Sequence, residues 1–174
     1  QLAEHKGVDL LLTAFQQLAP CSAEVRIHGP LDQDPAHARH LRQLAGPGVH
    51  FLATFPPEEM AAVLAQIDVL VIPSRWYENS PLVLLYALAT HTPVVVSRVE
   101  GLTEFLEEGR NGFSFERGSA EDLARVLSRF LADPGLGRRL SATTTYDRTT
   151  ALMAADLVPV YQEARDRKST RLNS

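Results

Sequence analysis

The sequence predicts an α/β protein with a doubly wound parallel sheet flanked by helices. Two continuous apolar runs, residues 68–72 and 93–97, have the composition of strands buried on both faces, as in parallel sheets. The residues between them, 81–90, are apolar all round, which indicates a buried helix. Strand and helix patterns alternate over about 120 residues, and in sheets of this class ligands bind at the carboxyl ends of the strands.

The other elements are predicted in order along the chain. Apolar residues from Val8 to Leu18 repeat at the spacing of a helix face, and a short strand at 25–28 stops at Gly29. Further patterns predict a helix at 35–45, a strand at 49–52, a helix opened by Pro56 and Pro57, a short helix at 102–108, a strand at 112–115 and an amphipathic helix at 119–132. Ser80 is expected to cap the buried helix, with Pro81 at its first position. Pro159 predicts a last helix that is kinked or shorter than its pattern suggests.

Composition is that of a single-domain globular protein. The chain has 174 residues, 45% of them hydrophobic, which is enough for one continuous core. Its 17 basic and 21 acidic residues are nearly balanced, so we expect no nucleic-acid partner. Cys21 is the single cysteine, which excludes an internal disulfide and favours a cytoplasmic location. The N-terminus has neither an initiator Met nor a signal-peptide pattern, so we expect the chain to begin inside a longer protein.

The loop between the buried strand and the buried helix is the most informative segment, Pro73-Ser-Arg-Trp-Tyr-Glu-Asn-Ser-Pro81. Free backbone N–H groups from Ser80 to Val83, together with the helix dipole, make an anion site suited to a diphosphate. Glu78 lies three residues before the proline, where its carboxylate can reach a sugar or nucleotide hydroxyl near that diphosphate. The simpler alternative for Glu78 is a solvated loop carboxylate.

Several longer segments match one set of motifs in order and spacing. They are Lys6-Gly-Val-Asp-Leu10, Asp68-Val-Leu-Val-Ile-Pro-Ser74, Glu78-Asn-Ser-Pro-Leu82, Ala89-Thr-His-Thr-Pro-Val-Val95 and Gly109-Arg-Asn-Gly112. Together they resemble the large group 1 family of retaining glycosyltransferases, over roughly residues 1 to 145. The resemblance implies a Rossmann-like domain, the C-terminal, donor-binding half of a GT-B fold, with its first strand missing here. It predicts a nucleotide-sugar-binding domain over residues 1–166.

The resemblance implies a role for each matching position. Lys6, beside Gly7, would pair with the diphosphate of the sugar nucleotide, and Glu78 would lie against the donor sugar as the catalytic residue. The residues that follow Glu78 would offer their backbone to the donor: Asn79, Ser80, Pro81 and Leu82. The family holds the ribose with a second glutamate eight residues after the first, where this chain has Tyr86. A tyrosine there offers one neutral oxygen, which predicts a weaker ribose contact.

Some of these residues have simpler readings that the sequence leaves open. Lys6 taken alone would be a surface lysine, and Tyr86 on an apolar helix would be a core side chain. Trp76 and Tyr77 would either flank the sugar or cover the core at the loop. A second departure from the family is His91, where a glycine is usual and where a histidine would fill space. His37 and His40 are three residues apart and could share a metal, although two such ligands are usually solvated.

The expected function is that of a donor domain. It would bind a nucleoside diphosphate sugar for retaining transfer to an acceptor of unknown identity, held by an N-terminal domain that is absent here. No cofactor or metal is expected, and any peripheral membrane contact would come only through that absent domain. The alternatives are a non-catalytic nucleotide-sugar or carbohydrate-binding module and, less favoured, a nicotinamide-dependent dehydrogenase. The dehydrogenase is disfavoured because no Gly-x-Gly-x-x-Gly follows a strand.

The last eight residues, 167–174, differ in composition from the chain before them. They resemble a translated adapter-like tail and are expected to be non-native, so they are excluded from the predicted fold. The alternative is an ordinary polar C-terminus.

Overall fold

The computed structural model describes residues 2–18, 22–79 and 81–172, with side chains up to residue 165. Its described strands form parallel sheets, as predicted. β1 (Val25–His28) pairs with β2 (Val49–Leu52), and β4 (Val94–Ser97) lies between β3 (Leu70–Ile72) and β5 (Gly112–Phe115). The carboxyl ends of β3, β4 and β5 therefore lie at one edge of their sheet.

Helices follow the strands in the predicted order. The 3₁₀ segments are η1 (Glu4–Lys6), η2 (Pro57–Glu59) and η3 (Thr103–Phe105); the α-helices are α1 (Val8–Gln16), α2 (Pro35–Leu44), α3 (Met60–Leu64), α4 (Leu82–Ala89), α5 (Ala120–Ala132), α6 (Leu136–Thr143) and α7 (Thr150–Leu172). The α/β class with helices flanking parallel strands is thus confirmed.

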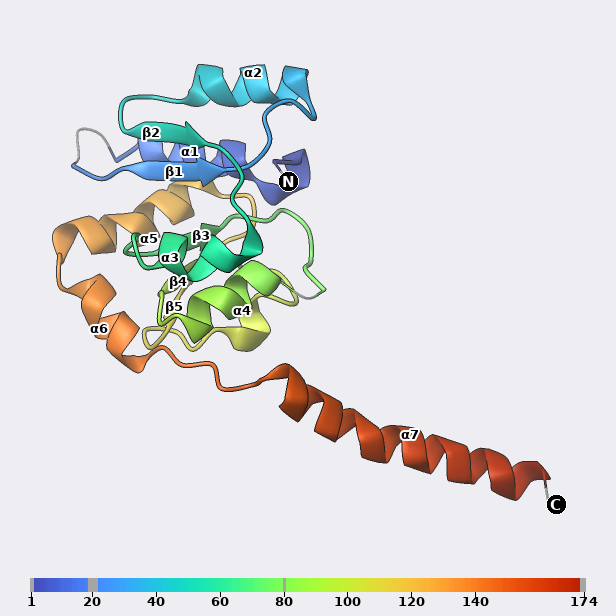
Figure 1. Ribbon diagram of the computed structural model, residues 1–174. Helices are drawn as coiled ribbons and strands as arrows, with labels where there is room; N and C mark the ends of the chain where they lie inside the picture. Colours follow the sequence, from blue (N-terminus) through green and yellow to red (C-terminus); the bar gives the residue numbers. More distant parts are fainter. Residues whose placement is uncertain (1, 19–21, 80, 173–174) are drawn as a thin grey trace.

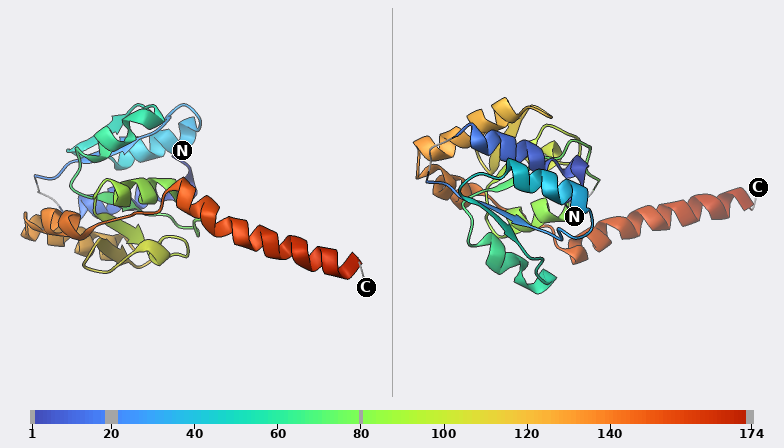
Figure 2. Two further views of the ribbon diagram at one scale, coloured as in Figure 1. Left: turned by 60° about the horizontal axis from the view of Figure 1, so that its bottom comes forward. Right: turned by 90° about the horizontal axis from the view of Figure 1, so that it is seen from above.

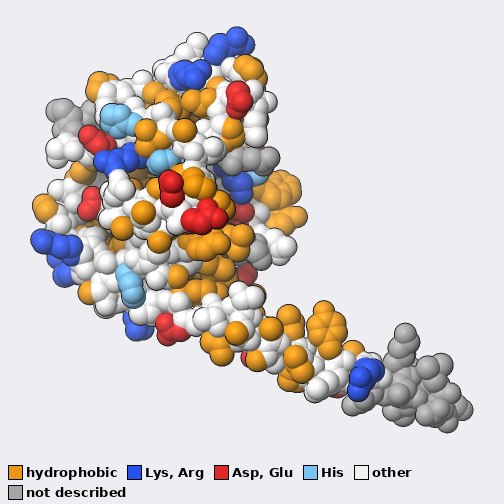
Figure 3. All heavy atoms as spheres, in the orientation of Figure 1, with side chains coloured by type: hydrophobic (Ala, Val, Ile, Leu, Met, Phe, Trp, Pro, Cys, Tyr) orange, Lys and Arg blue, Asp and Glu red, His pale blue; other side chains and the backbone are white. Residues whose placement is uncertain are grey.

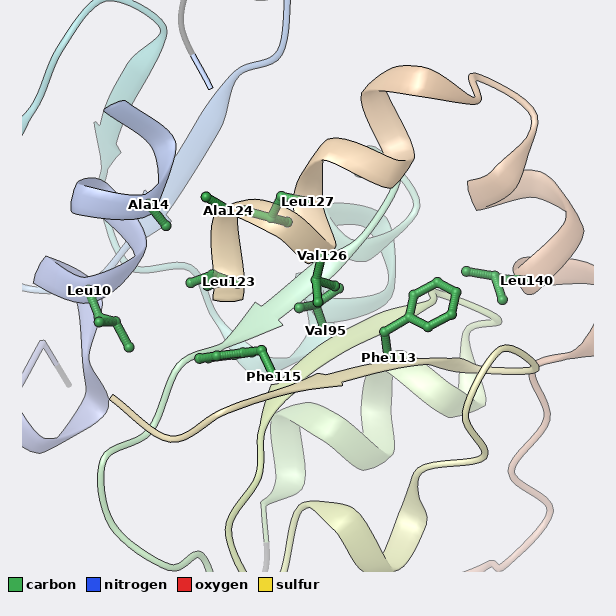
Figure 4. Packing of buried hydrophobic residues seen from close by; sticks show 10 residues of the cluster. All are labelled: Leu10, Ala14, Val95, Phe113, Phe115, Leu123, Ala124, Val126, Leu127 and Leu140. Atoms are coloured by element: carbon green, nitrogen blue, oxygen red, sulfur yellow. The ribbon is translucent and has the colours of Figure 1, made fainter. Parts of the chain in front are cut away.

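Strand β4 explains why both sheet faces are covered. All four of its residues are buried, and successive side chains of a strand point to opposite faces. Val95 packs with α1, α5 and α6 in one cluster, of which Figure 4 shows ten residues. Val94 and Val96 pack on the other face with α3 and α4. Two helical layers therefore enclose the strand, which is the doubly wound arrangement that its unbroken apolar sequence predicted.

The described strands form two separate sheets, one of β1 and β2 and the other of β3, β4 and β5. Strands β1 and β3 do not pair with each other. Helix α1 spans the two parts, because Leu12 packs with β1 and α2 whereas Leu10 and Ala14 pack with β4, β5 and α5. Packing through α1 therefore joins the two sheets on one face.

Two predicted helix boundaries differ from the structure. Helix α4 begins at Leu82 with Pro81 at the cap position, one residue later than predicted, and the proposed cap Ser80 lies outside the described residues. The helix predicted at 102–108 is only the 3₁₀ turn η3. It ends there because the Asn111 amide donates to the Phe105 carbonyl at 2.9 Å and accepts from the Glu107 N–H at 2.8 Å.

Helix α7 continues through Pro159 to Leu172, so the proline does not shorten it. The helix projects away from the rest of the molecule (Figures 1 and 2). Its apolar side chains are consequently exposed, as Figure 3 shows; they include Leu152, Met153, Leu157, Val158, Val160 and Tyr161. Within residues 2–172, outside the two gaps, no helix combines the length and apolar character needed to cross a bilayer.

Candidate functional site

Lys6 ends the short turn η1, and the fold requires the glycine that follows it. Gly7 has φ +69°, a conformation that favours glycine, and a Cβ there would lie 2.0 Å from the Pro73 carbonyl oxygen. Pro73 directly follows β3. The Lys6-Gly7 dipeptide is therefore packed against the carboxyl end of β3, which explains in physical terms why a glycine follows Lys6.

Glu78 is held in the loop between β3 and α4 by a second glycine contact. Its N–H donates to the Glu100 carbonyl oxygen at 3.0 Å. Gly101 has φ +81°, and a Cβ there would lie 1.5 Å from the Glu78 carbonyl oxygen. Hence only glycine lets the loop after β4 approach this closely. Glu78 thereby lies at the edge formed by the carboxyl ends of β3 and β4.

Lys6 and Glu78, 72 residues apart in the sequence, form an ion pair. The Lys6 ammonium donates to both carboxylate oxygens, at 2.7 and 3.0 Å. The hydroxyl of Ser74, which is buried, donates to Glu78 Oε1 at 2.5 Å. The Glu78 side chain is 15% exposed and the Lys6 side chain 36%. The two predicted site residues are thus brought together, and the Lys6 side chain is partly exposed to solvent.

Burial by itself raises the pKa of Glu78, but the hydrogen bonds from Lys6 and Ser74 outweigh it, with help from the charge of Lys6 and from His5 nearby. The net effect is a pKa below the ordinary value of 4.5. Glu78 is therefore ionised at neutral pH and acts as a hydrogen-bond acceptor rather than as a proton donor.

Helix α4 starts beside this pair. Its cap residue Pro81 makes no side-chain cap hydrogen bond, and first-turn N–H groups have no acceptor within their own helix. The backbone N–H groups of Leu82 and Val83 are therefore candidate donors to an anion. Asn79 is exposed in the preceding loop. The predicted donor-binding residues that the structure describes thus lie on η1 and its following glycine, on the β3–α4 loop and on α4.

Tyr86 lies on the exposed side of α4 and is 46% exposed, which excludes its reading as a core side chain. Leu82, one turn earlier, and Val83 are exposed as well. Trp76 and Tyr77 in the preceding loop are also exposed, with ring centroids 5.4 Å apart, so they do not cover the core. The site loop and the start of α4 therefore present apolar side chains to solvent.

His91 adopts the left-handed conformation, with φ 60°. This backbone geometry explains why a glycine suits the position. The His91 ring nitrogen Nδ1 forms a hydrogen bond with the Thr144 carbonyl oxygen at 2.6 Å. Rather than only filling space, the side chain joins the turn after α4 to the residue that follows α6.

Other chemically suggestive residues are placed elsewhere. His37 and His40 lie on α2, with ring centroids 6.5 Å apart. Asp34 caps that helix, because its carboxylate accepts hydrogen bonds from the Ala36 and His37 N–H groups. Among the residues the structure describes, no three His, Cys, Asp or Glu side chains are grouped to hold a metal ion.

A cavity of about 420 Å³ lies between the β1–β2 pair and α3. It is lined by Glu24, Arg26, His28, His50, Leu52, Val63, Gln66 and Ile67. None of the predicted site residues lines it. The predicted residues Lys6 and Glu78 contact each other and do not line the cavity. The candidate functional site is therefore the region around this pair rather than the cavity.

Sequence reasoning missed two charged residues beside this site. The Arg75 guanidinium donates to both oxygens of Asp9, at 2.9 and 2.7 Å. Arg75 belongs to the informative loop and Asp9 to the motif that begins at Lys6, so both lay in segments already singled out. Nothing in the spacing of either segment indicated that they pair.

The chain is similar to known proteins of one family. The model of the family described as "Glycosyl transferases group 1" matches residues 1–133. D-inositol 3-phosphate glycosyltransferase from Nocardioides sp. is 32% identical over 155 residues, covering 79% of this chain and 34% of that protein. The chain therefore spans about a third of the length of this curated relative.

Solved structures share the fold. Sucrose-phosphate synthase from Thermosynechococcus elongatus superposes with a TM-score of 0.80 at 26% identity, covering 96% of this chain and 44% of that one. The Anabaena protein Alr3699/HepE, in complex with UDP-glucose, gives a TM-score of 0.72 at 21% identity, covering 97% and 46%.

Proposed function

Because the chain belongs to the group 1 glycosyltransferase family, we propose that it is the half of a GT-B enzyme that binds the nucleoside diphosphate sugar. Transfer would proceed with retention of configuration to an acceptor held by a separate N-terminal domain. One observation carries the proposal: Lys6 and Glu78 meet at 2.7 Å beside the start of α4. A cation, the backbone N–H groups of a helix N-terminus and a carboxylate suit a diphosphate joined to a sugar.

Each group has a distinct task in this proposal. The Lys6 ammonium has three N–H donors and contacts two oxygens of Glu78, so at least one donor remains for a phosphate oxygen. The N–H groups of Leu82 and Val83 would bind the same diphosphate. As the bond to the sugar breaks, negative charge grows on the leaving diphosphate, and these fixed positive groups stabilise it. No metal or cofactor is required for this step.

Glu78 would accept a hydrogen bond from a hydroxyl of the donor sugar, since its lowered pKa keeps it ionised. Tyr86, exposed one turn into α4, would lie by the ribose. The similar Anabaena structure holds UDP-glucose, which supports a nucleotide sugar as the ligand class. We propose a cytoplasmic location, and we expect no transfer by the 174-residue chain alone, because the acceptor site would lie outside it.

Titration calorimetry with a nucleoside, its monophosphate and its diphosphate tests the proposal, using uridine and guanosine series. The diphosphate of at least one series should bind more tightly than the monophosphate, and Lys6→Ala should remove that difference. Equal binding of all three forms, or no binding of any diphosphate, would refute the donor site.

Tyr86 favours a second candidate function, a non-catalytic nucleotide-sugar or carbohydrate-binding module. A tyrosine has no charged carboxylate for the ribose hydroxyls. The chain therefore lacks the second glutamate with which the family holds the ribose of its donor. Donor hydrolysis or sugar transfer by the longer parent protein separates the two candidates. Either activity, if lost in Glu78→Gln, identifies an enzyme; donor binding without either activity identifies a binding module.

A further inference from the structure

The Lys6–Glu78 pair connects the turn η1 to the β3–α4 loop, two segments far apart in the sequence. Lysine is a flexible side chain, and this one is 36% exposed, so its own ion pair is a weak means of fixing its position. The packing of Gly7 against the Pro73 carbonyl brings the backbone after η1 close to the β3–α4 loop, but it does not orient the Lys6 side chain. Arg75, which lies between Ser74 and Glu78 in that loop, makes further contacts to the segment around Lys6.

Arg75 reaches the segment around Lys6 in three ways. Its backbone N–H donates to the His5 carbonyl oxygen at 2.8 Å, and its Nη1 lies 3.4 Å from the Glu4 carbonyl oxygen. Its guanidinium also donates to both oxygens of Asp9, in the first turn of α1. These contacts fall on both sides of Lys6. The segment from Glu4 to Asp9 is therefore attached to the loop that carries Glu78.

The geometry of the Arg75–Asp9 pair suits a positioning role. Two parallel N–H···O bonds fix the orientation of both groups, which a single contact does not. The Asp9 side chain is only 18% exposed and the Arg75 side chain 36% exposed. Lysine has no such planar fork and makes one point contact instead, so Arg75→Lys keeps the charge but loses the orientation.

We propose that Arg75 and Asp9 are positioning residues, whose two-pronged ion pair holds the Lys6 ammonium against Glu78 and so places the positive charge that faces the donor diphosphate. The statement about the diphosphate rests on the function proposed above; the statement about Lys6 and Glu78 does not. Neither Arg75 nor Asp9 needs to touch the donor, and neither belongs to the catalytic residues.

The ionisation of Glu78 reports directly on the position of Lys6. We would follow the Glu78 side-chain carboxyl carbon by NMR over a pH titration of the 174-residue chain and its variants. In Arg75→Lys and Asp9→Asn, the Glu78 midpoint should rise toward 4.5, because Lys6 no longer stays within hydrogen-bond distance. The Asp9→Asn result is decisive, since the removal of a nearby negative charge would by itself lower that midpoint.

The matched control is Arg125→Lys, which loosens another two-bond arginine contact, to Asp122 on α5 at 2.8 and 2.5 Å. Its Glu78 midpoint should equal that of the wild type. The double variant Asp9→Asn with Arg75→Lys should shift the midpoint no further than the larger single change, because both act through one contact. An unchanged midpoint in folded Arg75→Lys, a lowered midpoint in folded Asp9→Asn, or additive shifts in the double variant, would overturn the proposal.

Affinity for a nucleoside diphosphate, measured on the same proteins, separates this proposal from the proposed function. We expect a loss of about tenfold in Arg75→Lys and in Asp9→Asn, the effect of one misplaced charge-assisted hydrogen bond, and none in Arg125→Lys. A wild-type chain that binds no diphosphate would refute the donor site, while the titration would still decide whether Arg75 and Asp9 position Lys6. A wild-type chain that binds with unchanged affinity in both variants would overturn the diphosphate part of the proposal.

Discussion

Replacing Lys6 by alanine should affect ligand binding and stability very differently. The ammonium makes a two-oxygen contact with Glu78, at 2.7 and 3.0 Å, but the lysine side chain is 36% exposed. Ion pairs with this much solvent contact contribute at most about 1 kcal/mol to folding. For a chain of this size, we therefore expect the melting temperature to fall by no more than about 2 to 4 °C.

The same substitution should weaken nucleoside diphosphate binding strongly. A charge-assisted hydrogen bond to a phosphate contributes roughly 1.5 to 3 kcal/mol, which corresponds to about a ten- to hundredfold loss of affinity. Without the ammonium, the Glu78 carboxylate also faces the diphosphate with less compensation, so the loss should lie toward the upper end. Calorimetric titration and thermal melting of the same samples measure both quantities.

Arg125→Ala is the matched control for this experiment, because Arg125 also loses an ion pair, with Asp122, on a helix outside the site. It should lower the melting temperature slightly and leave diphosphate affinity unchanged. If Lys6→Ala binds the diphosphate as tightly as the wild type, Lys6 is a surface residue and the reasoning fails. If both variants lose affinity alike, the loss reflects stability rather than the site.

The remaining predictions concern Glu78, Tyr86, the tail and pH. In the longer parent enzyme, Glu78→Gln should lower turnover strongly while nucleoside diphosphate affinity stays within a few fold, since its proposed contact is to the sugar; steady-state kinetics showing equal loss of both would make it a nucleotide or structural residue. Tyr86→Glu should tighten diphosphate binding in calorimetry, because a carboxylate accepts both ribose hydroxyls; weaker binding would place the ribose elsewhere. Deleting residues 167–174 should change neither the melting temperature nor ligand affinity, and a fall of several degrees would show that the tail packs natively. Folding lowers the pKa of Glu78, so the ionised Glu78 stabilises the folded protein fully above pH 4.5, and this contribution is lost as the pH falls through the folded-state pKa. The melting temperatures of the wild type and Glu78→Gln should therefore converge in acid. A difference between them that widens in acid would contradict the lowered pKa of Glu78.

The sequence predicts the central fold because its strongest patterns are set by burial alone. β4 is buried at every position, so an unbroken apolar run is required there whatever surrounds it. α4 buries Leu84, Ala87 and Leu88, which fixes only its inner face. η3 is shorter than predicted because the Asn111 side chain, six residues downstream of Phe105, takes over its backbone hydrogen bonds. A contact of that kind leaves no periodic trace in the sequence.

The site itself is only partly predictable. Lys6 and Glu78 were identified through the motifs they belong to, but their ion pair and the Arg75–Asp9 pair join residues 72 and 66 positions apart. Such contacts depend on which strand ends meet in the folded sheet. The exposure of Tyr86 was likewise unpredictable, because an apolar neighbourhood in the sequence suggests burial on every side, whereas α4 leaves the face with Leu82, Val83 and Tyr86 uncovered.

The central claim is that the chain binds a nucleoside diphosphate sugar at Lys6 and the start of α4. Its most direct test is a thermal-shift panel of nucleoside diphosphate sugars on the wild-type chain and on Lys6→Ala, at concentrations up to a hundred times the dissociation constant. Ligand at that excess stabilises a protein by about 2.7 kcal/mol, or roughly 5 to 10 °C for a chain of this length. We predict a shift of that size for at least one nucleotide sugar with the wild type, and a much smaller one with Lys6→Ala at the same ligand concentration. No shift with any member of the panel, or an equal shift in both proteins, would contradict the account.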